Sequence, residues 1–295
     1  MKTTFPEKAK KFFTSWEFVL LLILFAEIVI FATKNPKFLM PRVLFGSLND
    51  IISICIISLF VTFVMITGGI DIQAGSIVGL SSIVLGVAWQ DGGMNIWAAV
   101  ALAVVVAGVC GALSGYFVAY CGVQPMVVTL GGSFLFTGVA LLVSNLSATE
   151  SYKGISGFPD SFLQISKFKL FGVIPCQVII FLVLAVIAYV LLNKTKYGRM
   201  VFLIGVNKDA AEFSGINTRL ITMTTYILSG ISAAIAGIIL TSYIGTAKSD
   251  IGVTFTLPII TAVVLGGTLS TGGKGSVVGT ALAAVVIGVL KFGLP

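Results

Sequence analysis

Apolar residues run along this chain in long blocks, and charged residues occur only in the short segments between them. No Asp, Glu, Lys or Arg occurs in the stretches 51–70, 72–90, 92–149, 170–193, 220–247 and 251–273. A helix needs about 20 mostly apolar residues to cross the hydrocarbon core of a bilayer. The pattern therefore predicts a helical membrane protein whose spans lie largely within these blocks.

We predict nine membrane-spanning helices in one all-α, polytopic bundle that occupies residues 1–295. They lie at about 17–33, 45–66, 73–90, 95–119, 126–146, 174–193, 220–243, 255–270 and 276–293. The first could be a cleaved signal peptide, but no small-residue cleavage site follows it, so we expect a retained helix. Glycines spaced four apart, as in Gly75/Gly79 and Gly111/Gly115, favour close approach of helices within a bilayer.

Composition supports the same class. The chain is 57% hydrophobic and 10% charged, with a mean hydropathy of +1.10. Soluble domains are about a quarter charged, so a soluble protein is excluded. The net charge of +7 lies in the segments between spans, where topology explains it better than nucleic acid does. The chain has no histidine and its four cysteines are scattered, so we expect no metal site and no cofactor.

Basic residues predict the orientation. They cluster in the tail 1–16 (Lys2, Lys8, Lys10 and Lys11) and in the loop 194–219 (Lys194, Lys196, Arg199, Lys208 and Arg219). Short loops rich in Lys and Arg stay in the cytoplasm, so we expect both segments there and 147–173 as the large outward loop. Lys34, Lys37 and Arg42 fall on the opposite side and count against this assignment.

The segment VMITGGIDIQAGSIVGL, residues 64–80, places one carboxylate inside an apolar block. Backbone that is not helical at membrane depth is tolerated where protein or a water-filled cavity satisfies it. We expect a helix break over 67–76 that involves Thr67, Gly68, Gly69, Asp71, Gly75 and Ser76. The favoured role for Asp71 is to cap the following helix and brace the break; a direct ligand contact and a proton or cation site are the alternatives.

The stretch GRMVFLIGVNKDAAEFSGINTRL, residues 198–220, is charged and lies between two spans. Asn207 is a candidate N-cap and Gly215 a candidate stop for a short helix at 208–214. An ordinary solvated loop is the alternative.

This stretch resembles the cytoplasmic loop of ABC-transporter permeases that import monosaccharides, the ribose type. The matching positions are Gly198, Arg199, Gly205, Asn207, Ala210, Ala211, Ser214, Gly215 and Ile216. TGGIDIQAGSIVGL (67–80), QPMVVTLGG (124–132) and AVVLGGTLSTGGKGSVVGT (262–280) resemble further family segments, so the resemblance covers roughly residues 18–293. Such permeases usually have ten spans, whereas nine are predicted here. A permease that lacks the tenth span is expected to assemble less stably.

The resemblance implies a permease without an ATP site of its own. Its partners would be two ATPase subunits, a second and different permease subunit, a periplasmic substrate-binding protein and membrane lipid, but no nucleic acid. Residues 205–216 would form the coupling loop that contacts the ATPase. Candidate residues of the translocation path are Thr129, Gly131, Thr256 and Thr261.

Within this family, three stretches resemble the permeases of autoinducer-2 importers: GISGFPDSF (154–162), VFLIG (201–205) and SYIGTAKSDIGVTFTLPIITAVVLGG (242–267). The last lacks the acidic residues that sugar permeases usually carry there. The expected ligand is therefore autoinducer-2, carried across a bacterial inner membrane, with a pentose or hexose such as ribose as the alternative.

Two other functions are less well supported. TGGKGS (271–276) looks like a phosphate-binding loop, but Thr268 and Gly275 stand where that motif needs glycine and a hydroxyl residue. An ion-coupled secondary transporter would need several acids or histidines within its spans, and only Glu27, Asp71 and Asp50 qualify. We find no cluster of nucleophile, base and orienting acid that would indicate a membrane enzyme.

Overall fold

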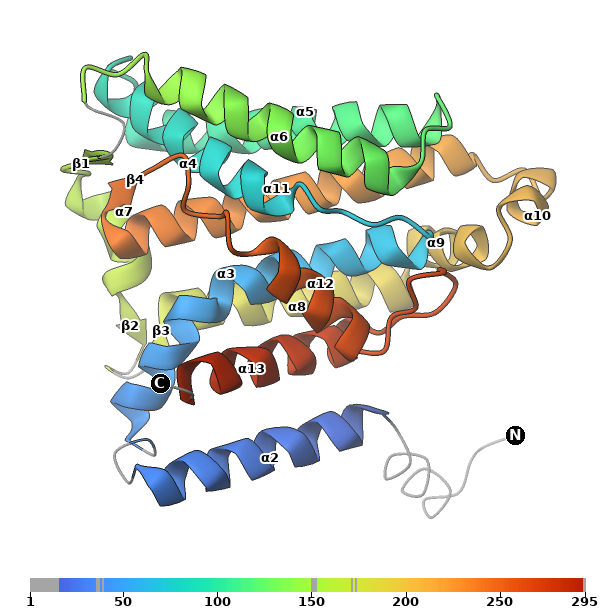
Figure 1. Ribbon diagram of the computed structural model, residues 1–295, viewed down its shortest axis with the longest axis horizontal. Coiled ribbons are helices and arrows are strands. Elements are labelled where there is room, and N and C mark those ends of the chain that lie inside the picture. The colour runs from blue at the N-terminus through green and yellow to red at the C-terminus, as the bar shows by residue number, and fades with distance from the viewer. Residues whose placement is uncertain are drawn as a thin grey trace.

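The computed structural model describes residues 16–35, 38, 40–149, 153–170, 172 and 174–293. The four lysines of the tail and Lys37, which bear on the predicted orientation, lie outside these residues. Within the described part, nine apolar helices follow the predicted order (Figure 1). They are α2 (Trp16–Lys34), α3 (Pro41–Ile66), α4 (Ala74–Gln90), α5 (Ile96–Ala119), α6 (Pro125–Ser144), α8 (Cys176–Lys194), α11 (Thr218–Ile244), α12 (Thr256–Leu265) and α13 (Val277–Gly293).

Five of these helices, α2, α5, α6, α8 and α11, are long and apolar enough to cross a membrane within the residues searched. The helix α12 is shorter than the predicted span 255–270. It has ten residues, which correspond to about 15 Å at 1.5 Å per residue, roughly half of a hydrocarbon core. It ends at Leu265 because Gly266 and Gly267 follow, and Gly267 adopts a left-handed φ of +88°.

The segments between the long helices contain structure that hydropathy did not predict. The predicted outward loop holds α7 (Asp160–Lys167), and the loop 194–219 holds α9 (Lys196–Val206) besides α10 (Lys208–Phe213). Four two-residue strands form two antiparallel pairs: β1 (Ile155–Ser156) with β4 (Thr246–Ala247), and β2 (Lys169–Leu170) with β3 (Ile174–Pro175). In the first pair Ile155 lies opposite Ala247, which ties the α7 region to the end of α11.

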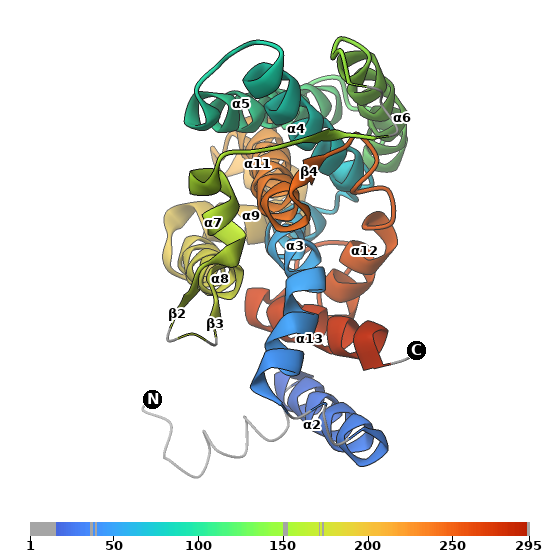
Figure 2. The ribbon, with the colours of Figure 1, turned by 90° about the vertical axis from the view of Figure 1, so that its left-hand side faces the viewer.

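The helices α3 and α11 lie at the centre of the bundle when it is viewed nearly end on (Figure 2). The helices α4, α5 and α6 pack on one side of them, α7 and α8 on a second, and α12 and α13 on a third, with α2 outermost against α13. Small residues allow this packing. A Cβ on Gly111 would overlap the carbonyl of Tyr226, and one on Gly79 would overlap the carbonyl of Ser249. The predicted role of the spaced glycines in close helix approach is therefore confirmed at Gly111, which meets α11, whereas Gly79 meets the turn at Ser249 rather than a helix.

The turn between α12 and α13, residues 266–276, folds back onto the end of α3. The amide of Gly273 donates to the carbonyl of Ile66 at 2.9 Å. At the other side of the turn, Trp16 Nε1 donates to the carbonyl of Leu265 at 2.6 Å. This turn therefore joins the first helix of the described chain to the point where α3 ends.

Candidate functional site

A helix break lies between α3 and α4. The chain leaves α3 at Ile66, runs without helical structure through residues 67–73 and enters α4 at Ala74. Gly68 takes a φ of +83°, which a residue with a side chain rarely adopts. The predicted break was too long at its far end, because Gly75 and Ser76 already belong to the first turn of α4.

Asp71 is the charged residue of this break, and it is 1% exposed. Its Oδ1 accepts the backbone N–H of Gln73 at 3.0 Å, and its Oδ2 accepts the hydroxyl of Ser229 on α11 at 2.6 Å. Gln73 is the N-cap residue of α4. The carboxylate therefore fixes the start of α4 and joins it to α11. Each of its two oxygens has a hydrogen-bond donor.

Gln73 extends the same network to a third helix. Its Oε1 accepts the hydroxyl of Ser114 on α5 at 2.6 Å. It also lies so close to Gly132 of α6 that a Cβ there would overlap it. Gln73 and Ser114 are fully or almost fully buried. Sequence analysis did not select either residue, although an amide two positions after Asp71 in an apolar block was a usable signal.

Two threonines that were predicted to line the path instead hold the backbone of the break. Thr129 on α6 donates to the carbonyl of Ile70 at 2.9 Å, and Thr256 on α12 donates to the carbonyl of Ile72 at 3.1 Å. A carbonyl released from helical pairing needs a donor at membrane depth. Together with Asp71 and Gln73, these bonds attach the break to α5, α6, α11 and α12.

The other two predicted path residues lie apart from this network. Gly131 is exposed, and no atom lies within 4 Å of the position a Cβ would take. Thr261 is also exposed, and its hydroxyl donates to the carbonyl of Leu257 on its own helix at 2.8 Å. The structure therefore divides the four predicted residues into two that brace the break and two that face outward.

Ser76 takes part in a small polar cluster just beyond the break. Its hydroxyl lies 3.2 Å from that of Ser133 and accepts the hydroxyl of Thr137 at 3.0 Å. Both partners belong to α6 and are partly buried. This cluster places hydroxyl groups between α4 and α6, and sequence analysis identified only Ser76.

The segment after α8 forms two short helices with clear caps. Thr195 accepts the amide of Gly198 at the start of α9, and Asn207 accepts the amide of Ala210 at 2.9 Å at the start of α10. Gly215 follows α10 with a φ of +80°. The predicted cap at Asn207 and stop at Gly215 are therefore confirmed. The helix itself ends at Phe213, one residue earlier than expected.

The residues of α10 face in different directions. Ala211 is 4% exposed and packs against the chain itself, whereas Ala210 is exposed and Phe213 is 93% exposed. Of the two alanines that match the family motif, only Ala210 is therefore exposed to a partner. Ser214 donates back to the carbonyl of Ala210 at 2.8 Å and closes the helix, with Ile216 following.

The helix α9 contacts the helix break directly. A Cβ on Gly205 would overlap the carbonyl oxygen of Ile66, the last residue of α3, and would come within 2.5 Å of the amide nitrogen of Gly273. No side chain fits between these three backbone segments. Gly205 was selected from the motif, but its contact partners could not be read from the sequence.

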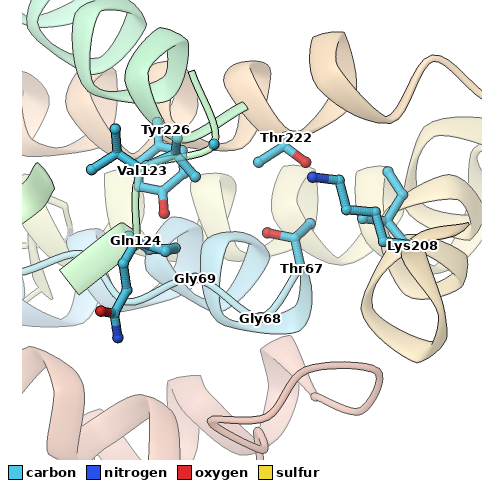
Figure 3. Close-up of a pocket in the computed structure, with 12 residues that line it drawn as sticks. Thr67, Gly68, Gly69, Val123, Gln124, Lys208, Thr222 and Tyr226 are labelled. Atoms are coloured by element: carbon cyan, nitrogen blue, oxygen red, sulfur yellow. The ribbon is translucent and has the colours of Figure 1, made fainter. Parts of the chain in front are cut away.

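A cavity of about 190 Å³ lies beside this contact (Figure 3). It is lined by the break at 67–69, the turn between α5 and α6 at 122–125, and residues of α5, α9, α10 and α11. Lys208 extends from α10 toward Thr222 and Thr67, and Tyr226 lies at the other end (Figure 3). The cavity therefore has walls from both the break and the α9–α10 segment.

Comparison with known proteins places the chain in a family. Residues 43–294 match the family described as branched-chain amino acid transport system / permease component. The autoinducer 2 import system permease protein LsrD of Photorhabdus laumondii is 42% identical over 279 residues, which cover 95% of this chain and 83% of that protein.

The LsrD protein of Salmonella typhimurium is 42% identical over 280 residues, with 95% and 84% covered, and that of Yersinia pseudotuberculosis is 42% identical over 279 residues, with 95% and 83% covered. No solved structure matches the chain. The family match spans most of the chain, and its helices lie where hydropathy predicts membrane spans. The chain therefore belongs to this family of ABC-transporter permeases and is a polytopic membrane permease component rather than an ATPase.

Proposed function

We propose that this chain is the permease subunit through which an ATP-driven importer carries autoinducer-2 across the bacterial inner membrane. One observation carries the substrate assignment: relatives described as autoinducer 2 import permeases are 42% identical over 95% of the chain. The loss of acidic residues around Thr256–Ala262, where sugar permeases usually carry them, supports a ligand other than a common monosaccharide.

The α9–α10 segment is the proposed coupling element. The exposed Phe213, with Asp209 and Glu212 beside it, forms an outward surface on α10 where an ATPase subunit would dock. Movement of α10 would reach α9 directly, since only Asn207 separates the two helices. Gly205 would pass the movement to Ile66, where α3 gives way to the break.

The break is the proposed moving part of the path. Its backbone is held by the hydroxyls of Thr129 and Thr256 and, through Asp71, by Ser229. The bonds from the two threonines contribute about 1 kcal/mol each and the bond from Ser229 to the carboxylate about 1.5–3 kcal/mol, so a small change in free energy can exchange them. Asp71 acts as a brace in this proposal, and Gly131 and Thr261, which face outward, remain the candidates to line the route beside a second permease subunit.

The remaining partners and the orientation belong to the same proposal. The tail 1–16 and the loop 194–219 lie in the cytoplasm, and the segment 147–173 faces the periplasm, where a substrate-binding protein would deliver a small polyhydroxy ligand. Two ATPase subunits and a different second permease complete the importer. The basic residues of the two cytoplasmic segments support this orientation.

Co-purification from membranes with the cognate ATPase, second permease and binding protein tests the proposal. We compare the chain with Phe213→Arg and with the matched control Phe168→Arg, whose phenylalanine is 56% exposed and follows α7. Phe213→Arg should lose the ATPase while Phe168→Arg keeps it, and equal capture by both variants would refute docking at α10.

Uptake into proteoliposomes then tests the substrate. ATP-dependent uptake of autoinducer-2 in excess over ribose is the expected result. Preference for ribose would overturn the substrate and leave the permease role intact. Uptake driven by an ion gradient without ATPase would instead favour the secondary-transporter alternative.

A further inference from the structure

The cavity beside the helix break has the size of a small ligand site. Its volume of about 190 Å³ corresponds to about six water molecules at the liquid share of about 30 Å³ each. Its polar lining residues come from the helix break, the α5–α6 turn, α10 and α11. A ligand in this space would therefore touch four parts of the chain at once.

Two polar side chains around the cavity, those of Lys208 and Tyr226, can donate hydrogen bonds into it, while Gln124, Thr67 and Thr222 also offer acceptor oxygens. Lys208 directs its ammonium group inward between Thr222 and Thr67 (Figure 3), and no ion pair of Lys208 exists among the described residues. Tyr226 is 0% exposed, and its hydroxyl has no hydrogen-bond partner in the described part of the chain. The hydroxyl of Thr67 already donates to the carbonyl of Val64 at 2.8 Å.

The chemistry of these groups selects an anion. A buried hydroxyl without a partner costs stability, and one anionic oxygen can satisfy it while another meets the ammonium group of Lys208. Lysine commonly binds phosphate groups as a point charge. Asp71, the buried carboxylate of the break, does not line the cavity, and both its oxygens already accept hydrogen bonds from Gln73 and Ser229. Its negative charge still acts on the hydroxyl of Tyr226, so Lys208 supplies the main attraction for the anion and Tyr226 supplies a hydrogen bond.

We propose that the cavity is a regulatory site for a small, water-soluble oxyanion of the phosphate type, held by Lys208, Tyr226 and Thr222. Its regulatory meaning rests on the proposed function, in which this end of the bundle faces the cytoplasm. A bound anion joins α10 to the helix break and to α11. Because transport requires α10 and the break to move, the anion holds the permease in one conformation and slows uptake.

Binding can be measured on the purified full chain in detergent without any transport. The unfolding temperature is followed as inorganic phosphate rises, with ionic strength held constant by chloride, because a ligand that binds the folded state raises it. The variants are Lys208→Gln, Tyr226→Phe and the control Lys196→Gln. Lys196 is the first residue of α9 as Lys208 is of α10, both lysines are exposed, and only Lys208 lines the cavity.

The wild type and Lys196→Gln should be stabilised by phosphate in a saturable way, and Lys208→Gln should need at least about tenfold more phosphate, since a charge-assisted bond is lost. Tyr226→Phe should be at least as stable as the wild type without phosphate, because it removes an unpartnered hydroxyl, and should also bind phosphate more weakly. An equal response of the wild type and Lys208→Gln would overturn the site. Stabilisation by vesicles of phosphatidylglycerol but not by inorganic phosphate would overturn the soluble anion.

A second readout separates this site from the proposed function. In proteoliposomes, phosphate on the ATPase side should slow uptake by the wild type more than uptake by Lys208→Gln. If phosphate binds as expected but no autoinducer-2 is taken up, the substrate assignment fails and the binding site stands. If uptake proceeds and phosphate neither binds nor slows it, the site fails and the proposed function stands.

Discussion

Gly205 of α9 lies directly against the carbonyl oxygen of Ile66, the residue at which α3 ends. The same carbonyl accepts the amide of Gly273 at 2.9 Å. Three backbone segments that are distant in the sequence therefore meet at one peptide group. Because only backbone atoms meet at this contact, we expect a displacement of α9 to move the end of α3 with it.

Gly205→Ala should impair transport and stability together. Its Cβ would overlap the backbone of Ile66, which cannot rotate away as a side chain can, and overpacking typically costs about 1–3 kcal/mol. The measurements are the unfolding temperature and ATP-dependent uptake. Gly138→Ala is the matched control, because no atom lies within 4 Å of its added Cβ, and it should leave both unchanged. Normal uptake by Gly205→Ala would remove this contact from the mechanism.

Asp71→Asn should weaken the brace of the helix break. The amide nitrogen cannot accept a hydrogen bond, so either the hydroxyl of Ser229 or the N–H of Gln73 loses its acceptor. Hydrogen bonds to charged groups contribute about 1.5–3 kcal/mol, and uptake should fall by about tenfold or more. A double-mutant cycle with Ser229→Ala measures the coupling. Independent effects of the two substitutions, or unchanged uptake and expression in Asp71→Asn, would show that Asp71 is not a brace.

Thr129→Val and Thr256→Val should each loosen the break by about 1 kcal/mol. Valine keeps the shape of threonine but cannot donate to the carbonyls of Ile70 and Ile72. Thr261→Val is the control, because its exposed hydroxyl bonds only within α12. Unfolding in detergent should show a lower midpoint for the first two variants and no change for the third. A lower midpoint for Thr261→Val than for the other two variants would contradict the role of Thr129 and Thr256 in holding the break.

Labelling of the native Cys121 tests the proposed orientation. This exposed, free cysteine lies at the turn between α5 and α6, at the same end of the bundle as α10 (Figure 1). A membrane-impermeant maleimide should label it in inverted membrane vesicles and not in spheroplasts. Cys121→Ser should abolish that signal. Labelling from the outside alone would reverse the orientation and place α10 out of reach of a cytoplasmic ATPase.

The sequence by itself determined the number and order of the apolar helices, the break near Gly68 and the caps of α10. Hydropathy over some 20 residues, a glycine that adopts φ above zero and an asparagine before a short helix are local signals. The resemblance to importer permeases likewise rested on short motifs, and the family match over residues 43–294 bears it out.

Only the tertiary structure decided which polar residues brace the break. Helices such as α5 and α8 are apolar on all sides, so the sequence does not indicate which face of a span meets a neighbour. Thr129 and Thr256 reach carbonyls 59 and 184 positions away, and Ser229 reaches Asp71 across 158 positions. Those contacts depend on how each helix is rotated and placed in the bundle, and close packing of backbones at small residues such as Gly205 determines that arrangement.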